Sequence, residues 1–308
     1  MLKDIRGRDI MKVKQICIVA LVLVVAMLAA YASEDVLFFT KEDVNQSKYL
    51  DPSTTEVNFS LEDAKSILIS EKPKIIVESI NGELIDKDGF GLIWLLSSKT
   101  TDGNSIVAGI NASSLELVFV YGDGEPKKMQ GNGKISEDEA LEIAELYLKS
   151  KLSVEKINEI KLEGVKYWSP DYKISYARII RGIPSLSDGI QIGVSTETNE
   201  ISSYRKKWSM DEDEIALIDT KPSITKEKAT NIIKEYMSNS PYIGKEKANT
   251  VKIKSSTLVW KEGDDDKIHL AWEVRFVDSS FDESDSITAS AWIDAHSGEI
   301  LMFLYARD

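Results

Sequence analysis

The chain has 308 residues, 43% of them hydrophobic, which excludes an intrinsically disordered protein and suits two or three globular modules. Its net charge of −13 and its pI of about 4.9 argue against nucleic acid and anionic lipid as partners. The single cysteine, Cys17, excludes an intramolecular disulfide and leaves the rest of the chain without a thiol for catalysis.

The N-terminal segment has the pattern of an export signal. Two lysines precede an apolar run over residues 16–30, and the small-x-small sequence Ala30-Tyr31-Ala32 follows. We expect residues 1–32 to form a hydrophobic helix that is either a cleaved signal peptide or a retained membrane anchor. By the positive-inside rule the protein is exported, and is secreted or held at the outer face of the cytoplasmic membrane. Residues 33–56 read as a linker.

Three segments further along share a helix-start signature. Each has Ser or Thr as N-cap with acidic residues in the first turn, and one also has a complete capping box. The segments are Ser60-Leu-Glu-Asp-Ala64, Ser136-Glu-Asp-Glu-Ala140 and Thr225-Lys-Glu-Lys-Ala229. Apolar residues at helical spacing follow, such as Ala229, Ile232, Ile233 and Tyr236 in the third copy. The pattern therefore predicts three amphipathic helices.

A second phrase also occurs three times, in register with the helix starts. Its copies are Ile110-Asn-Ala-Ser-Ser-Leu-Glu-Leu117, Val194-Ser-Thr-Glu-Thr-Asn-Glu-Ile201 and Ile293-Asp-Ala-His-Ser-Gly-Glu-Ile300. Each predicts a strand end, a tight turn and a second strand. Asn199 and Gly298 tolerate the positive φ that such turns need, so Leu115 at this position predicts a different turn in the first copy.

Strand signals lie between helix and turn. The alternation of residues 267–276 puts Ile268, Leu270 and Trp272 on the same face as Val274 and Phe276, as in a half-buried antiparallel strand. Trp94 and Tyr176 lie at comparable positions in the other copies. We therefore predict an α+β fold of three tandem units, each an amphipathic helix packed on a small antiparallel sheet. These units, called repeats 1 to 3 below, span residues 57–125, 134–210 and 222–308.

These residues carry a family resemblance. Repeat 3, from Thr225 through Leu270-Ala-Trp-Glu-Val274 to Trp292-Ile-Asp-Ala-His-Ser-Gly-Glu-Ile-Leu301, resembles a PepSY-type domain. Repeat 2 is similar through Tyr176–Pro184 and Gly189–Val194, and repeat 1 resembles it more weakly. Such domains occur in propeptides of thermolysin-like peptidases, where they inhibit the attached peptidase and assist its folding. An unrelated α+β repeat protein is the alternative.

No catalytic or cofactor-binding motif is present in the sequence. The two histidines, His269 and His296, are not part of a His-Glu-x-x-His sequence, and no phosphate-binding loop or dinucleotide fingerprint occurs. Ser153 and Ser223 each precede a lysine by three residues, a spacing best explained by chance. An enzyme that uses scattered carboxylates stays open. The acidic loops 263–266 and 278–285 offer oxygen ligands for calcium, although solvated loops are the favoured interpretation.

The sequence and the resemblance together favour binding over catalysis. We expect an exported, non-enzymatic PepSY-like protein that binds or modulates another extracytoplasmic protein, with a peptidase as the first candidate. The alternative is a structural or ligand-sensing module of the cell envelope without inhibitory activity. The polar strand face of His269, Glu273 and Arg275 is the candidate surface for a partner. Contact with the membrane is expected only through the N-terminal helix.

Overall fold

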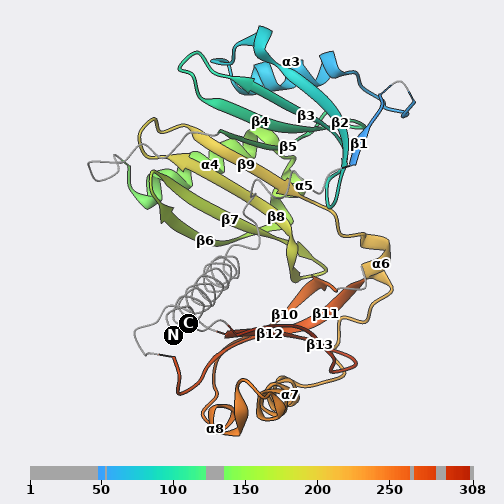
Figure 1. Ribbon diagram of the computed structural model, residues 1–308, viewed down its shortest axis with the longest axis vertical. Coiled ribbons are helices and arrows are strands. Elements are labelled where there is room, and N and C mark those ends of the chain that lie inside the picture. The colour runs from blue at the N-terminus through green and yellow to red at the C-terminus, as the bar shows by residue number, and fades with distance from the viewer. Residues whose placement is uncertain (1–47, 53, 123–134, 264–266, 282–288, 306–308) are drawn as a thin grey trace, which may run out of the picture. The chain divides into compact units, whose positions relative to one another are not determined.

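The computed structural model describes residues 48–52, 54–122, 135–263, 267–281 and 289–305 (Figure 1). Two compact units divide these residues. The large unit contains residues 48–219 and Trp260–Glu262, and the small unit contains the remaining described residues from Thr220 onward. The fold is a mixed α+β fold with mostly antiparallel sheet and few helices. The division into three repeats stays a prediction, as does the linker.

The large unit is built on one antiparallel sheet. Its strand order is β1-β2-β3-β4-β5-β9-β8-β7-β6. The strands are β1 (Lys48–Leu50), β2 (Asn81–Lys87), β3 (Gly91–Lys99), β4 (Ser105–Asn111), β5 (Leu117–Gly122), β6 (Ile160–Trp168), β7 (Asp171–Ile180), β8 (Ile183–Ser195) and β9 (Ile201–Lys207). Pairing of β5 with β9, through Phe119 opposite Arg205 and Val120 opposite Tyr204, joins the strands of repeats 1 and 2 into that sheet.

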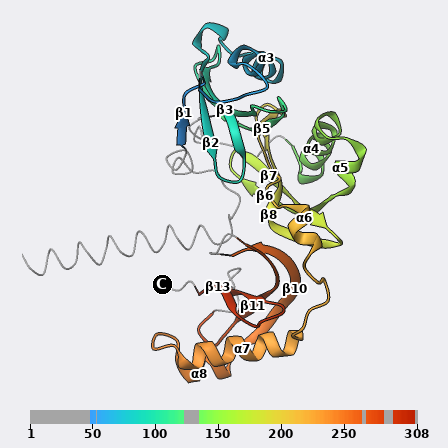
Figure 2. The same cartoon turned by 90° about the vertical axis from the view of Figure 1, so that its right-hand side faces the viewer.

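Helices lie on one face of this sheet (Figure 2). They are α3 (Leu61–Glu71), α4 (Glu137–Lys151) and α5 (Val154–Asn158); the unit also contains the 3-10 segment η1 (Val77–Ser79) and the short helix α6 (Glu212–Ala216). Capping boxes start α3 at Ser60 and α4 at Ser136, which confirms the predicted helix starts. The apolar faces of both helices pack into one core with the sheet, which includes Ala64, Leu68, Ala140, Ala144, Leu148, Ile110, Ile174 and Ile192.

The small unit repeats this plan with four strands. Its elements are α7 (Lys226–Asn239), α8 (Gly244–Asn249), β10 (Lys252–Glu262, of which Trp260–Glu262 belong to the large unit), β11 (Ile268–Val277), β12 (Ala289–Asp294) and β13 (Ile300–Leu304). Thr225 caps α7, and Ala229, Ile233 and Met237 of this helix are buried against Val274 and Phe276 of β11. The predicted strand alternation is therefore confirmed. Tyr236, expected on the apolar face, is instead half exposed, because Met237 takes the buried position.

The three turn phrases form the same structure. In each, the N–H of the second residue (Asn111, Ser195 or Asp294) donates across the turn, to the carbonyls of Glu116, Glu200 and Glu299, at 2.8–2.9 Å. The side chains of Asn111, Ser195 and Asp294 each accept two backbone N–H groups from the turn. The sixth residue has positive φ in all three: Leu115 56°, Asn199 59° and Gly298 84°. The expectation that Leu115 turns differently is therefore wrong.

A local cost and its compensation explain the Leu115 turn. A left-handed conformation costs a residue with a Cβ roughly 1–2 kcal/mol. Asn111 Oδ1 accepts from Ser113 N at 2.9 Å and from Ser114 N at 3.0 Å, so its side chain fixes this turn as the Asp294 side chain fixes the third. Leu115 also packs against the core of the large unit. Burial and the side-chain hydrogen bonds together offset the strain.

Several predicted segments lie outside the described residues. They are the hydrophobic segment 1–32, most of the linker, the boundary at 123–134, and most of the two acidic loops. Within the residues that the structure does describe, no helix combines the length and the apolar character needed to cross a bilayer.

Candidate functional site

The three residues predicted to bind a partner take part in two separate contacts. His269, Glu273 and Arg275 do lie on one face of β11, as alternation requires. The Arg275 side chain is 55% exposed and donates from Nε to Glu273 Oε1 at 3.1 Å, whereas the Glu273 side chain is only 12% exposed. His269 belongs to a separate cluster, because its Nδ1 lies 2.8 Å from Asp294 Oδ2 on the neighbouring strand.

Asp294 brings both histidines of the chain together. Its Oδ1 accepts from His296 N at 2.9 Å and from Ser297 N at 2.6 Å, while Oδ2 contacts His269. Burial opposes ionisation of this carboxyl, but the hydrogen bonds from Ser297, His269 and His296 outweigh it and hold the pKa of Asp294 below its ordinary value. The carboxylate therefore stays ionised and fixes the turn.

The same cluster is not a catalytic triad. Ser223 Oγ lies 3.1 Å from His296 Nδ1, a distance that would suit a serine nucleophile and a histidine base. In a triad the carboxylate orients the imidazole that serves as base, whereas Asp294 Oδ2 contacts the ring of His269 and Oδ1 accepts from the backbone of His296. The backbone of Ser223 donates to Ala295 O at 2.9 Å, so this contact ties the start of α7 to the turn.

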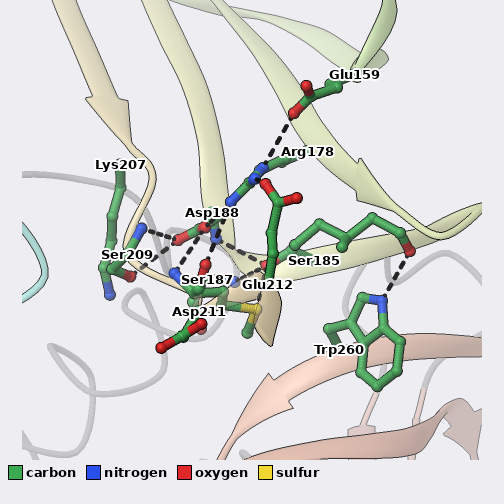
Figure 3. Close-up of polar contacts among 12 residues, drawn as sticks. Glu159, Arg178, Ser185, Ser187, Asp188, Lys207, Ser209, Asp211, Glu212 and Trp260 are labelled. Carbon is green, nitrogen blue, oxygen red and sulfur yellow. Dashed lines mark hydrogen bonds and ion pairs between the residues drawn. The ribbon is translucent and has the colours of Figure 1, made fainter. Parts of the chain in front are cut away.

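The large unit contains a buried ion pair that was not predicted (Figure 3). Arg178 on β7 and Asp188 on β8 are both buried, with Nη1 and Oδ2 3.1 Å apart. Asp188 Oδ1 also accepts from the N–H and hydroxyl of Ser209 at 2.8 and 2.9 Å, and Oδ2 accepts from Met210 N at 2.9 Å. Four donors therefore converge on the two oxygens of one buried carboxylate.

Arg178 also forms ion pairs with two further carboxylates. Its Nη2 donates to Glu212 at the start of α6, and Nε lies 3.5 Å from Glu159 Oε2, close enough for an ion pair though not a hydrogen bond. Its guanidinium lies over the ring of Trp208 at 4.6 Å. Removing one partner of such a buried pair typically costs about 3–5 kcal/mol. The arrangement therefore holds β7, β8 and the chain after β9 together.

A second buried cation flanks the same tryptophan. Lys206 is buried, pairs with Glu116, and places Nζ 5.0 Å from the centre of the Trp208 ring. Burial lowers the pKa of the Lys206 amine, and Glu116 opposes this shift. The indole thus contacts two cations, each paired with a carboxylate, as expected of buried charges. These contacts stabilise the packing around Trp208.

Each predicted repeat has an aromatic residue at a comparable strand position: Trp94, Tyr176 and Trp272. Trp94 Nε1 donates to Phe59 O, and Trp272 Nε1 donates to Ile224 O, each at 3.0 Å and each just before a helix N-cap. Tyr176 holds the comparable place in repeat 2, but its buried hydroxyl has no hydrogen-bond partner within the described chain. Burial, with a smaller contribution from Glu145, raises the pKa of Tyr176 to about 12.

The remaining candidates have local roles or lie outside the described chain. Ser153 is the N-cap of α5 and accepts from Lys156 N at 3.4 Å, so its spacing from Lys156 reflects capping. Asp278 in the second acidic loop accepts from Ser280 and Tyr305. Nowhere in the described residues do three or more His, Cys, Asp or Glu side chains gather as metal ligands would. Calcium binding by the rest of the loops stays a prediction.

Two helix-covered antiparallel sheets with buried ion pairs define this as a mixed α+β protein whose described charged clusters serve the fold. A family model described as "YcdB, YcdC repeated domain" matches residues 59–208, most of the large unit. Among solved structures, the chain is similar to the Bacillus megaterium YpeB C-terminal domain, at 17% identity and a TM-score of 0.49 over 82% of this chain and 100% of that chain. No curated protein matches the chain.

Proposed function

We propose that this chain is an exported, non-enzymatic protein of three tandem PepSY-like units that binds or modulates another extracytoplasmic protein. The sequence resemblance of repeats 2 and 3 to PepSY-type domains supports this class of protein. The three equivalent turns support a repeated unit. The match of residues 59–208 to a family described as a repeated domain agrees with that interpretation. A peptidase is the first candidate partner, because the resembling modules accompany peptidases.

The observation that carries the proposal is the β11–β13 face of the small unit opposite α7. Strand alternation places Glu273 and Arg275 there, and register places Met302 opposite Trp292 on the same face. Arg275 is exposed and Met302 is partly exposed. Arginine and methionine are residue types enriched in protein interfaces, whereas Trp292 is buried at 5% exposure. This face therefore has the composition of a surface that binds another protein.

A second candidate function is a structural or ligand-sensing envelope module without inhibitory activity. The feature that favours it is the apolar run of residues 16–30, which is nearly long enough to serve as a retained anchor. An anchored chain would act at the membrane surface rather than in the medium. The partner that is recovered distinguishes the two functions.

The test is affinity capture with the tagged full chain from the envelope and medium of its host. Recovery of a peptidase whose activity falls when the chain is added supports an inhibitor. Recovery of an envelope component without a peptidase supports the second function. The double variant Glu273→Gln/Arg275→Gln should lose the partner, whereas the charge-matched control Lys245→Gln/Glu246→Gln on α8 should retain it. Equal capture by both variants would remove this face from consideration.

A further inference from the structure

The chain that leaves β9 crosses the β7–β8 hairpin as a distinct segment, residues 209–218, called the strap below. It contains α6 and ends shortly before the small unit begins. Apart from the hydrogen bonds within α6, its backbone–backbone hydrogen bonds join residues three or four apart in the sequence. They run from Ile215 N to Asp211 O, from Leu217 N to Glu214 O and from Ile218 N to Ile215 O. Within the described residues none of them reaches the sheet. The strap is therefore not a strand of the sheet.

Charged side chains hold the strap at two places. At the inner place, Asp188 accepts from the backbone of Ser209 and Met210, and Arg178 reaches Glu212. At the outer place, Arg181 Nη1 donates to Ile215 O at 2.8 Å and to Ile218 O at 2.9 Å. Ile215 O, which also accepts from Ile218 N, lies in the last turn of α6, and Ile218 O lies two residues after the helix ends.

The strap buries little apolar surface. Met210 and Ile215 are buried, whereas Leu217 is 88% exposed. Two buried side chains and a few charge-assisted hydrogen bonds therefore resist its release. The sheet beneath is held by complete strand ladders and a large apolar core. Local opening free energies are lowest where buried apolar contacts are few.

The backbone at Arg181 also indicates a role beyond the turn. Arg181 has φ 51° and Gly182 has φ 80°, the paired left-handed conformation of a tight hairpin turn. Asn is the residue that favours the first of these positions, and a long side chain has no advantage there. The guanidinium contacts with Ile215 and Ile218 give this arginine a function that the turn does not require.

We infer that the strap is a releasable segment, which opens from the β7–β8 hairpin while the sheet stays folded. Release would free residues 209–218 without unfolding the strand ladders beneath them.

Hydrogen exchange on the full chain tests this directly. We expect strap amides of residues 213–218 to exchange faster than those of Ile190 and Ile192 in β8. Arg181→Asn, which suits the turn but removes the outer contacts, should speed strap exchange about tenfold or more and leave β8 unchanged. Lys149→Gln, which removes one positive charge on α4, is the control and should change neither. Equal rates for strap and β8 in the unchanged chain, or equal acceleration of both by Arg181→Asn, would overturn the inference.

Discussion

Asp188→Asn tests the buried ion pair of the large unit directly, because aspartate and asparagine side chains have nearly the same shape and differ in charge. The two carboxylate oxygens accept four hydrogen bonds, from Arg178, from the N–H and hydroxyl of Ser209 and from Met210 N. The amide keeps one acceptor oxygen and replaces the other with an NH₂ group. Two of the four donors would then face a donor.

The expected cost follows from burial. The substitution leaves the buried Arg178 without its closest enclosed carboxylate, and breaking such a pair typically costs about 3–5 kcal/mol. Glu159 and Glu212 soften the loss only partly, because both are more exposed than Asp188. For a unit of this size the loss corresponds to a decrease in Tm of about 10 °C.

Urea unfolding of the full chain, followed by tryptophan fluorescence, measures the effect. The transition of the large unit should move to lower urea while that of the small unit stays in place. Asp86→Asn, an exposed position on β2, is the control and should change stability by less than about 0.5 kcal/mol. A loss below about 1 kcal/mol in Asp188→Asn would refute the view that this pair holds the unit together.

Three further predictions concern single positions. Tyr176→Phe removes a buried hydroxyl that has no described partner, so it should leave the large unit as stable or stabilise it by about 1 kcal/mol; a thermal melt showing marked destabilisation would reveal a partner. Because the pKa of Asp294 is lowered on folding, its stabilisation is complete above the ordinary aspartate pKa and is lost as the pH falls through the lowered value. Asp294→Asn should therefore flatten the acid limb of a stability–pH profile of the small unit, and an unchanged limb would contradict the assignment. Asn199→Ala should cost about 1 kcal/mol at its positive φ while Asn199→Gly costs less, and equal melting temperatures would argue against strain there.

Features that depend on neighbours in the sequence were predictable. The caps at Ser60, Ser136 and Thr225 follow from side chains within one helical turn of the backbone groups that they satisfy. The positive φ at Asn199 and Gly298 follows from the residue types alone. Leu115 was misjudged because intrinsic preference was weighed without its burial, which only the fold supplies.

Contacts between distant segments were not predictable from one sequence. Arg178 and Asp188 both lie in or beside the segments that resemble the PepSY pattern, yet nothing in their spacing shows that they meet. The pairing of His269 with Asp294 was missed for a related reason. Alternation placed the histidine on a polar face, but register between β11 and β12 decides what lies next to it.

The pairing of β5 with β9 also bears on how the protein avoids aggregation. Two separate small sheets would each present two open edges, and an open edge can recruit strands from other molecules. Joining them through Phe119, Val120 and Tyr121 removes one edge from each. A fragment ending before β9 would leave the β5 edge at Phe119–Tyr121 unpaired, and one containing residues 134–210 alone would leave the β9 edge beside Tyr204 unpaired. Such fragments should self-associate, so repeats 1 and 2 cannot be separated as soluble modules even though the sequence reads as two copies.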